Sequence, residues 1–147
     1  MENFKSITIY IMSLLYIIVG IKHFINPDFF INIVPNYICY KKEAVLLSGL
    51  IEVILGILLF FKQTRKIAAW GIILLLIAVF PSNIYLYVSE IARGKIGISK
   101  LQALVRMFFQ IPLLILAYWH SKEFLSKKTS LICSILFIIT ITYFITI

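Results

Sequence analysis

A single acidic residue interrupts an otherwise apolar stretch of this sequence, AVLLSGLIEVILGILLFF, residues 44–61. Glu52 lies in the middle, with Ser48 and Gly56 four residues away on either side, so the three share one face of a helix. An acid in an apolar helix is costly and usually faces a partner inside a bundle. Small residues beside it let a neighbouring helix approach closely. The pattern predicts that Glu52 points toward another helix.

A second polar stripe supplies a partner for this acid. Gln102, Arg106 and Gln110 are also four residues apart, in the apolar stretch 101–119. At about 1.5 Å per helical residue, Glu52 lies roughly 12 Å and Arg106 roughly 8 Å from the same end of their segments. An unpaired charge in lipid would be neutralised or expelled. We therefore predict that Glu52 is ionised and forms an ion pair with Arg106.

Two further segments place polar residues at the same depth. Asn83 follows Pro81, which has no N–H for the carbonyl one turn earlier, and His23 lies near the end of the first apolar segment. These groups are interpreted either as contacts that fasten the helices or as a pocket, open toward the outer face, for a small polar or quinone-like ligand. Quinone carbonyls need donors, which histidine, glutamine and arginine supply. The predicted polar set is His23, Glu52, Asn83, Arg106 and Gln110, with Pro35, Gly49 and Pro81 as structural residues and no catalytic or metal-binding residue.

The elements that must position these residues are membrane-spanning helices. Of the 147 residues, 62% are hydrophobic, and the mean hydropathy is +1.04. The apolar segments run for about 18 to 22 residues, the length that crosses a hydrocarbon core of roughly 30 Å as a helix. They lack the alternation of barrel strands, so backbone hydrogen bonding in lipid requires helices. The sequence predicts an all-α membrane protein.

Four apolar segments indicate firm spans, at residues 7–25, 44–61, 67–88 and 101–119, and the first is interpreted as an uncleaved span. Residues 131–147 are uncharged and rich in isoleucine and threonine, and they form either a fifth span or an interfacial tail. Their hydrophobicity favours the span. We therefore divide the chain into a four-transmembrane-helix bundle, residues 1–128, and an additional C-terminal apolar helix, residues 129–147.

The net charge of +8 reflects cations that lie between the apolar segments. Basic loops beside spans set topology and meet anionic lipid headgroups, so we expect the lipid bilayer and no nucleic acid as partner. The short basic loop KQTRK, residues 62–66, favours a cytoplasmic position for itself and for the N-terminus. Cys39 and Cys133 form no C-x-x-C pair and are poor candidates for redox chemistry.

Four sequence pieces, GIKHFINPDFFINIVP, SGLIEVILG, FPSNIY and VRMFFQIPLLILAYW, resemble the DoxX-like family of small bacterial membrane proteins over about residues 18–119. Their G-x-x-H-F, S-G-x-x-E, F-P-x-N and R-x-x-x-Q motifs carry the same five polar residues named above. The resemblance implies a four-helix bundle in the bacterial cytoplasmic (inner) membrane. The family takes its name from a subunit of a thiosulfate:quinone oxidoreductase or terminal quinol oxidase, and some relatives associate with redox-stress enzymes.

Three classes of function follow from these observations. The leading expectation, implied by the resemblance, is an accessory or quinone-binding subunit of a membrane redox system, with quinone as the candidate cofactor and a membrane redox protein as the candidate partner. The second is a membrane protein that binds or transports a small hydrophobic or weakly acidic molecule. The third is a structural scaffold for a membrane partner. The extra C-terminal stretch and the lack of a cysteine motif or haem-type histidine pair depart from the family and argue against catalysis by the chain alone.

Overall fold

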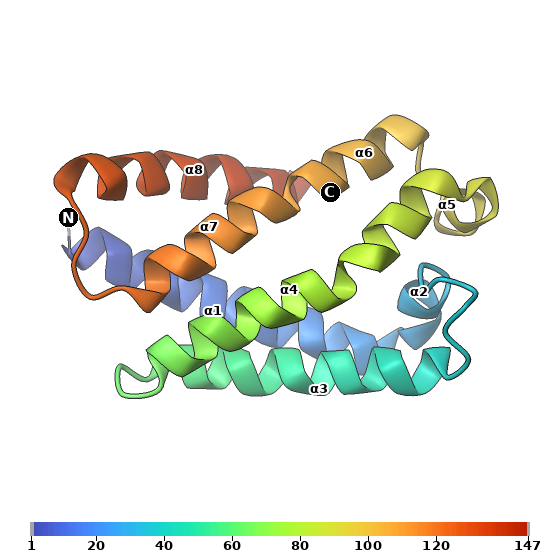
Figure 1. Ribbon diagram of the computed structural model, residues 1–147, viewed down its shortest axis with the longest axis horizontal. Coiled ribbons are helices and arrows are strands. Elements are labelled where there is room, and N and C mark those ends of the chain that lie inside the picture. The colour runs from blue at the N-terminus through green and yellow to red at the C-terminus, as the bar shows by residue number, and fades with distance from the viewer. Residues whose placement is uncertain (1, 147) are drawn as a thin grey trace.

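The computed structural model describes residues 2–146, and within that range every regular element is a helix (Figure 1). The helices are α1 (Glu2–Ile25), α2 (Pro27–Ile31), α3 (Lys41–Phe60), α4 (Arg65–Val88), α5 (Glu90–Ile96), α6 (Lys100–Phe108), α7 (Gln110–Ser121) and α8 (Lys127–Thr146). The predicted all-α class is confirmed.

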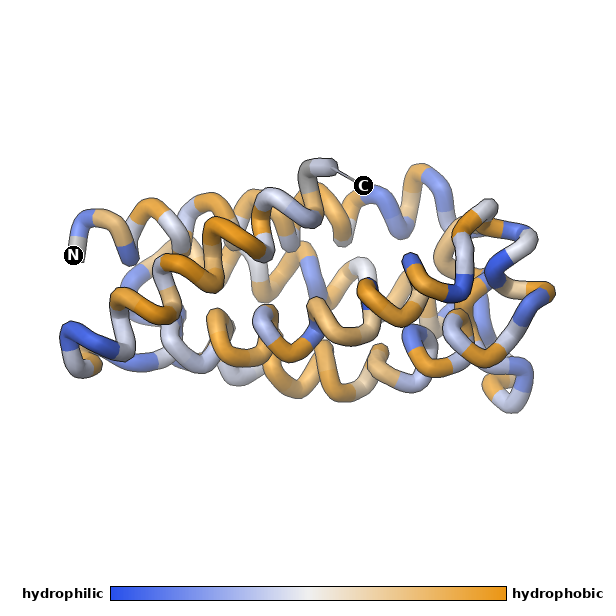
Figure 2. The backbone as a smooth tube through the Cα atoms, turned by 90° about the horizontal axis from the view of Figure 1, so that it is seen from above, coloured by the Kyte–Doolittle hydropathy of each residue, from blue (hydrophilic) through white to orange (hydrophobic). Residues whose placement is uncertain are grey.

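Among residues 2–146, five segments are long and apolar enough to cross a membrane, which is compatible with a membrane protein. They are α1, α3, α4, the consecutive helices α6 and α7 taken together, and α8. The last of these, Lys127–Phe144, confirms the prediction of a C-terminal helix with the length and composition of a membrane span. Figure 2 shows that hydrophilic backbone segments gather at the two ends of the molecule, while the length between them is mostly hydrophobic.

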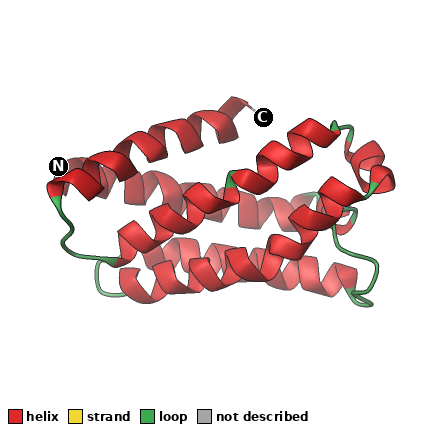
Figure 3. Ribbon diagram, turned by 45° about the horizontal axis from the view of Figure 1, so that its top comes forward, coloured by secondary structure: helices red, strands yellow, loops and turns green. Residues whose placement is uncertain are grey.

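The longer loops lie at these two ends, while a short break between α6 and α7 lies between them (Figure 3). The α3–α4 and α7–α8 connections lie at the end that holds the N-terminus, and α2 and α5 cover the opposite end (Figure 1). Pro27 is the first residue of α2, a position where its missing N–H costs no helical hydrogen bond. Pro35 is buried in the turn between α2 and α3, where its carbonyl accepts from the N–H of Ile38 at 3.1 Å, consistent with a structural role.

The closest helix pair is α1 with α3, and glycines account for the short distance between them. A Cβ atom added to Gly49 would lie 2.5 Å from the Cβ of His23 and 2.9 Å from the carbonyl oxygen of Gly20. At Gly56 it would lie 2.8 Å from a side-chain carbon of Ile17. The small residues around Glu52 therefore pack against α1. The expectation that they pack against the fourth span is wrong.

The remaining contacts form a ring of helices. α4 packs against α3 on one side and against α6 and α7 on the other, and α8 packs mainly against α7. Pro112 removes the N–H that would bond the carbonyl of Phe108, and the fourth span breaks at Phe109 into α6 and α7. Helix α4, in contrast, continues through Pro81.

The glycine contact makes a direct prediction for stability. We expect Gly49→Ala to destabilise the protein by about 1–3 kcal/mol, because the new methyl group overpacks the interface of α1 and α3. Gly94→Ala is the matched control, since a Cβ there meets nothing within 4 Å and alanine favours the helix. Thermal unfolding of both variants in mild detergent measures the difference. Equal midpoints for the two variants would contradict the close approach.

Candidate functional site

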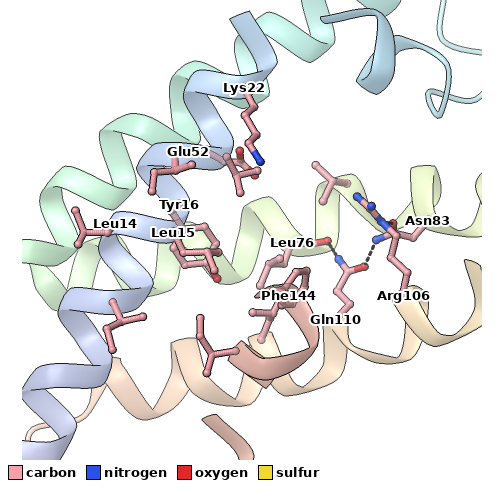
Figure 4. A pocket seen from close by; sticks show the side chains of 16 residues that line it. Leu14, Leu15, Tyr16, Lys22, Glu52, Leu76, Asn83, Arg106, Gln110 and Phe144 are labelled. Carbon is pink, nitrogen blue, oxygen red and sulfur yellow. Dashed lines mark hydrogen bonds between the residues drawn. The ribbon is translucent and has the colours of Figure 1, made fainter. Parts of the chain in front are cut away.

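A cavity of about 460 Å³ lies between α1, α4, α6, α7 and α8, with Glu52 reaching it from α3 (Figure 4). This volume falls within the roughly 300–1,000 Å³ of small-molecule sites. Most of its wall is aliphatic. The polar and charged residues that line it are Tyr16, Lys22, Glu52, Asn83, Arg106 and Gln110.

One wall of the cavity carries a chain of hydrogen bonds among three of the predicted residues. The side-chain nitrogen of Asn83 donates to Oε1 of Gln110 at 2.6 Å, and Nε of Arg106 donates to Oδ1 of Asn83 at 3.3 Å. The amide nitrogen of Gln110 donates in turn to the backbone carbonyl of Leu76, in the part of α4 that precedes Pro81. The chain joins α6 and α7 to α4 and holds Arg106 at the cavity.

The opposite wall brings His23 to Glu52. Nδ1 of His23 lies 3.4 Å from Oε2 of Glu52, but it also lies 2.9 Å from the carbonyl oxygen of Val19. The histidine ring stacks on Phe30 of α2, with the ring centroids 3.6 Å apart, which fixes its orientation. Glu52 lines the cavity, whereas His23 contacts Glu52 without lining the cavity.

The predicted ion pair between Glu52 and Arg106 is wrong. In residues 2–146 the acid has an ion-pair contact with His23, and Arg106 bonds instead to Asn83. Both side chains nevertheless line the same cavity. Their helices are not neighbours, however, because α4 packs between α3 and the fourth span. Glu52 and Arg106 therefore face the cavity from opposite sides (Figure 4).

Two polar atoms at the cavity have no hydrogen-bond partner among the described residues. They are the hydroxyl of Tyr16, a side chain only 5% exposed, and Oε2 of Glu52, whose histidine neighbour points its nitrogen at a backbone carbonyl. A buried polar group left without a partner costs about 1–3 kcal/mol. Both atoms are themselves buried and belong to residues that line the cavity.

Sequence reasoning missed Tyr16 and Lys22 as site residues. The available signal was the helical spacing of Tyr16, Gly20 and His23, which places the tyrosine on the face of α1 that meets α3. In contrast, Gln102 does not belong to the polar set at the cavity. It is exposed, and its side chain accepts from the N–H of Ser99 at 2.8 Å, completing a capping box at the start of α6.

These features define an all-helical protein, compatible with a membrane, whose apolar helices enclose a cavity with charged and hydrogen-bonding residues. The chain belongs to the family described as Domain of unknown function (DUF8561), which matches residues 12–121. This match includes every polar residue of the cavity and leaves out α8. Neither the curated proteins nor the solved structures give a match to the chain. The DoxX-like resemblance stays a prediction.

The hydrogen bond between Asn83 and Gln110 predicts coupled effects on stability. We expect Asn83→Leu and Gln110→Leu to show an interaction energy of about 0.5–3 kcal/mol in a double-mutant cycle, because the two side chains share one bond. Asn83→Leu combined with Thr142→Val, an exposed position on α8, should be additive. Unfolding in detergent measures both cycles. Equal additivity in the two cycles would mean that Asn83 and Gln110 do not touch.

Proposed function

We propose that this protein is a multi-pass membrane protein that binds a small, lipid-soluble molecule, with the molecule's polar head among Tyr16, Glu52 and Arg106. The observation that carries the proposal is the pair of unpartnered polar atoms, the Tyr16 hydroxyl and a Glu52 oxygen, on residues that line the cavity. In a purely structural bundle such atoms would be expected to find partners, because buried polar groups are nearly always hydrogen-bonded.

The chemistry of these residues favours a quinone as the head. The Tyr16 hydroxyl and the guanidinium of Arg106 donate to carbonyl oxygens, and a guanidinium has five N–H donors, of which Asn83 takes one. The Glu52 carboxylate accepts from the hydroxyl of the reduced form. A site with both kinds of group therefore suits quinone and quinol. The DoxX-like resemblance supports the same class and, with it, the role of an accessory subunit beside a membrane redox protein.

A second candidate is a weakly acidic lipid-soluble molecule, such as one with a carboxylate head. The cavity is lined by two cationic residues, Lys22 and Arg106, against one acidic residue, Glu52. An anionic head would balance this excess in an apolar environment, where an uncompensated charge is costly. The scaffold hypothesis accounts for the bonded residues, Asn83 and Gln110, but gives no role to the free Tyr16 hydroxyl.

The proposal includes the arrangement in the membrane. We place α1, α3, α4 and the α6–α7 span in a four-helix bundle, with α8 as a fifth span, in the bacterial cytoplasmic membrane with the N-terminus inside. The alternation of helix direction in Figure 1 supports five crossings, because the N-terminus and the α3–α4 and α7–α8 connections share one end. That end carries the cations of the KQTRK loop, Lys62, Arg65 and Lys66.

Topology reporters test this arrangement. We expect a reporter fused after Gln63 to give a cytoplasmic signal and one fused after Ile147 to give an external signal. From the cytoplasmic α3–α4 loop, α4 and the α6–α7 span lead out and back to the cytoplasmic α7–α8 connection, and α8 then crosses to the outside. Two cytoplasmic signals would show that α8 does not cross. An external signal after Gln63 would reverse the orientation.

Ligand binding is tested by thermal stabilisation, since a molecule that binds only the folded protein raises its melting midpoint. We expect ubiquinone or menaquinone analogues to raise the midpoint of the wild type. Tyr16→Phe should weaken binding by about twofold to tenfold, because the loss of one hydrogen bond costs about 0.5–1.5 kcal/mol. Tyr10→Phe, on the exposed face of the same helix, is the matched control.

The outcomes separate the candidates. Stabilisation by quinone analogues that falls in Tyr16→Phe and not in Tyr10→Phe supports the quinone class. Stabilisation by an alkyl carboxylate alone, weakened in Arg106→Gln, supports the weakly acidic ligand instead. No stabilisation by either class would contradict ligand binding by the cavity.

A further inference from the structure

The cavity is continuous with the lateral, apolar surface of the helices. Three of the α1 side chains that line it are themselves exposed, Ile11 at 38%, Leu14 at 52% and Ile18 at 53%. They lie in the middle of the apolar segment Asn3–Ile25, away from the hydrophilic ends of the molecule. In a bilayer this opening faces lipid, so a bound molecule can extend from the cavity into the hydrocarbon without crossing water.

The other edge of the opening is formed by the last turns of α8. Ile141 and Phe144 line the cavity, whereas α1 makes only a small contact with this helix. The ring of Tyr143 stacks on Phe109, with centroids 3.8 Å apart and planes within 11°, at the break between α6 and α7. This stack holds the end of α8 beside the cavity.

Along α1 the cavity lining begins with apolar residues, includes Tyr16 and ends with the charged Lys22. Lys22 lies near the end of α1 that leads to α2, whereas Ile11 lies eleven positions earlier, about 16 Å away at 1.5 Å per residue. The charged side chains Glu52 and Arg106 lie toward the Lys22 part of the cavity (Figure 4). The opposite part is lined by aliphatic side chains of α1 such as Leu14, and Phe144 lies beside Gln110 and Leu76 (Figure 4). The lining therefore has a head region and a tail region.

We propose that the ligand carries an apolar tail that passes between α1 and the last turns of α8, and that Ile141 and Phe144 determine which tails the site accepts. The inference rests on the proposed ligand site, but it holds for either class of head. It assigns a binding role to α8, which lies outside the residues matched by the family.

Two series of molecules test the proposal, each with one head and tails of increasing length. One series is benzoquinones, from the tail-free ring to a decyl derivative, and the other is alkyl carboxylates. For each molecule, affinity is measured for the wild type, for Phe144→Ala and for Ile138→Ala, an exposed α8 residue that does not line the cavity. The ratio of variant to wild-type affinity cancels partitioning of the tail into detergent or lipid.

We expect Phe144→Ala to bind the long-tailed members about tenfold more weakly than the wild type and to bind the tail-free ring equally well. Burial of one methylene group is worth about 0.8 kcal/mol, so the loss of two such contacts gives this factor. Ile138→Ala should match the wild type throughout. Phe144→Leu, which removes less volume, gives a smaller effect and serves if the alanine variant does not fold.

Each contrary result has a distinct meaning. A Phe144→Ala ratio that is the same at every tail length would overturn the tail site while leaving the headgroup site in place. An equal loss in Ile138→Ala would also overturn it, since the effect would then belong to the stability of α8. If no member of either series binds the wild type, the proposed function fails together with the inference.

Discussion

The side chain of Gln110 is the contact on which the polar half of the cavity depends. It is 4% exposed in an apolar bundle, so its amide must find partners within the protein. It donates to the carbonyl of Leu76 and accepts from Asn83, and Asn83 in turn accepts from Arg106. The Gln110 amide therefore fixes α7 against α4. Through Asn83 it also holds the guanidinium of Arg106 at the cavity, a position that the flexible arginine side chain would not keep without these bonds.

The opposite wall is positioned by a different force, the close packing of α1 and α3 at glycines. Gly49 has no side chain, and His23 occupies that space beside Glu52. The two walls are thus held separately, α1 against α3 mainly by close packing, with Ser13 donating to the carbonyl of Gly56, and α7 against α4 by hydrogen bonds. The cavity lies between them, and α8 completes its edge with Ile141 and Phe144. The Tyr16 hydroxyl and Oε2 of Glu52, on residues that line this cavity, have no hydrogen-bond partner among the described residues.

The helices and the depth of each polar residue were predictable from the sequence, because hydropathy and the rise per residue are one-dimensional properties. Glu52, Asn83, Arg106 and Gln110 all line one cavity. Which helices lie next to one another in the bundle cannot be predicted from these properties. The Glu52–Arg106 pair was wrong because α4 separates the helices, and Tyr16 was missed because one tyrosine in an apolar helix resembles ordinary core. The capping role of Gln102 was hidden by its regular spacing from Arg106.

The central claim is that the cavity holds a lipid-soluble molecule, and native mass spectrometry of the protein in mild detergent tests it most directly. We expect the wild type, purified from a bacterial membrane, to carry a bound small molecule in addition to any phospholipid. Arg106→Gln should lose that mass and keep the phospholipid, because the substitution removes the charged donor at the head region. Identical bound masses in the two proteins, or phospholipid alone in the wild type, would show that the cavity does not hold such a molecule.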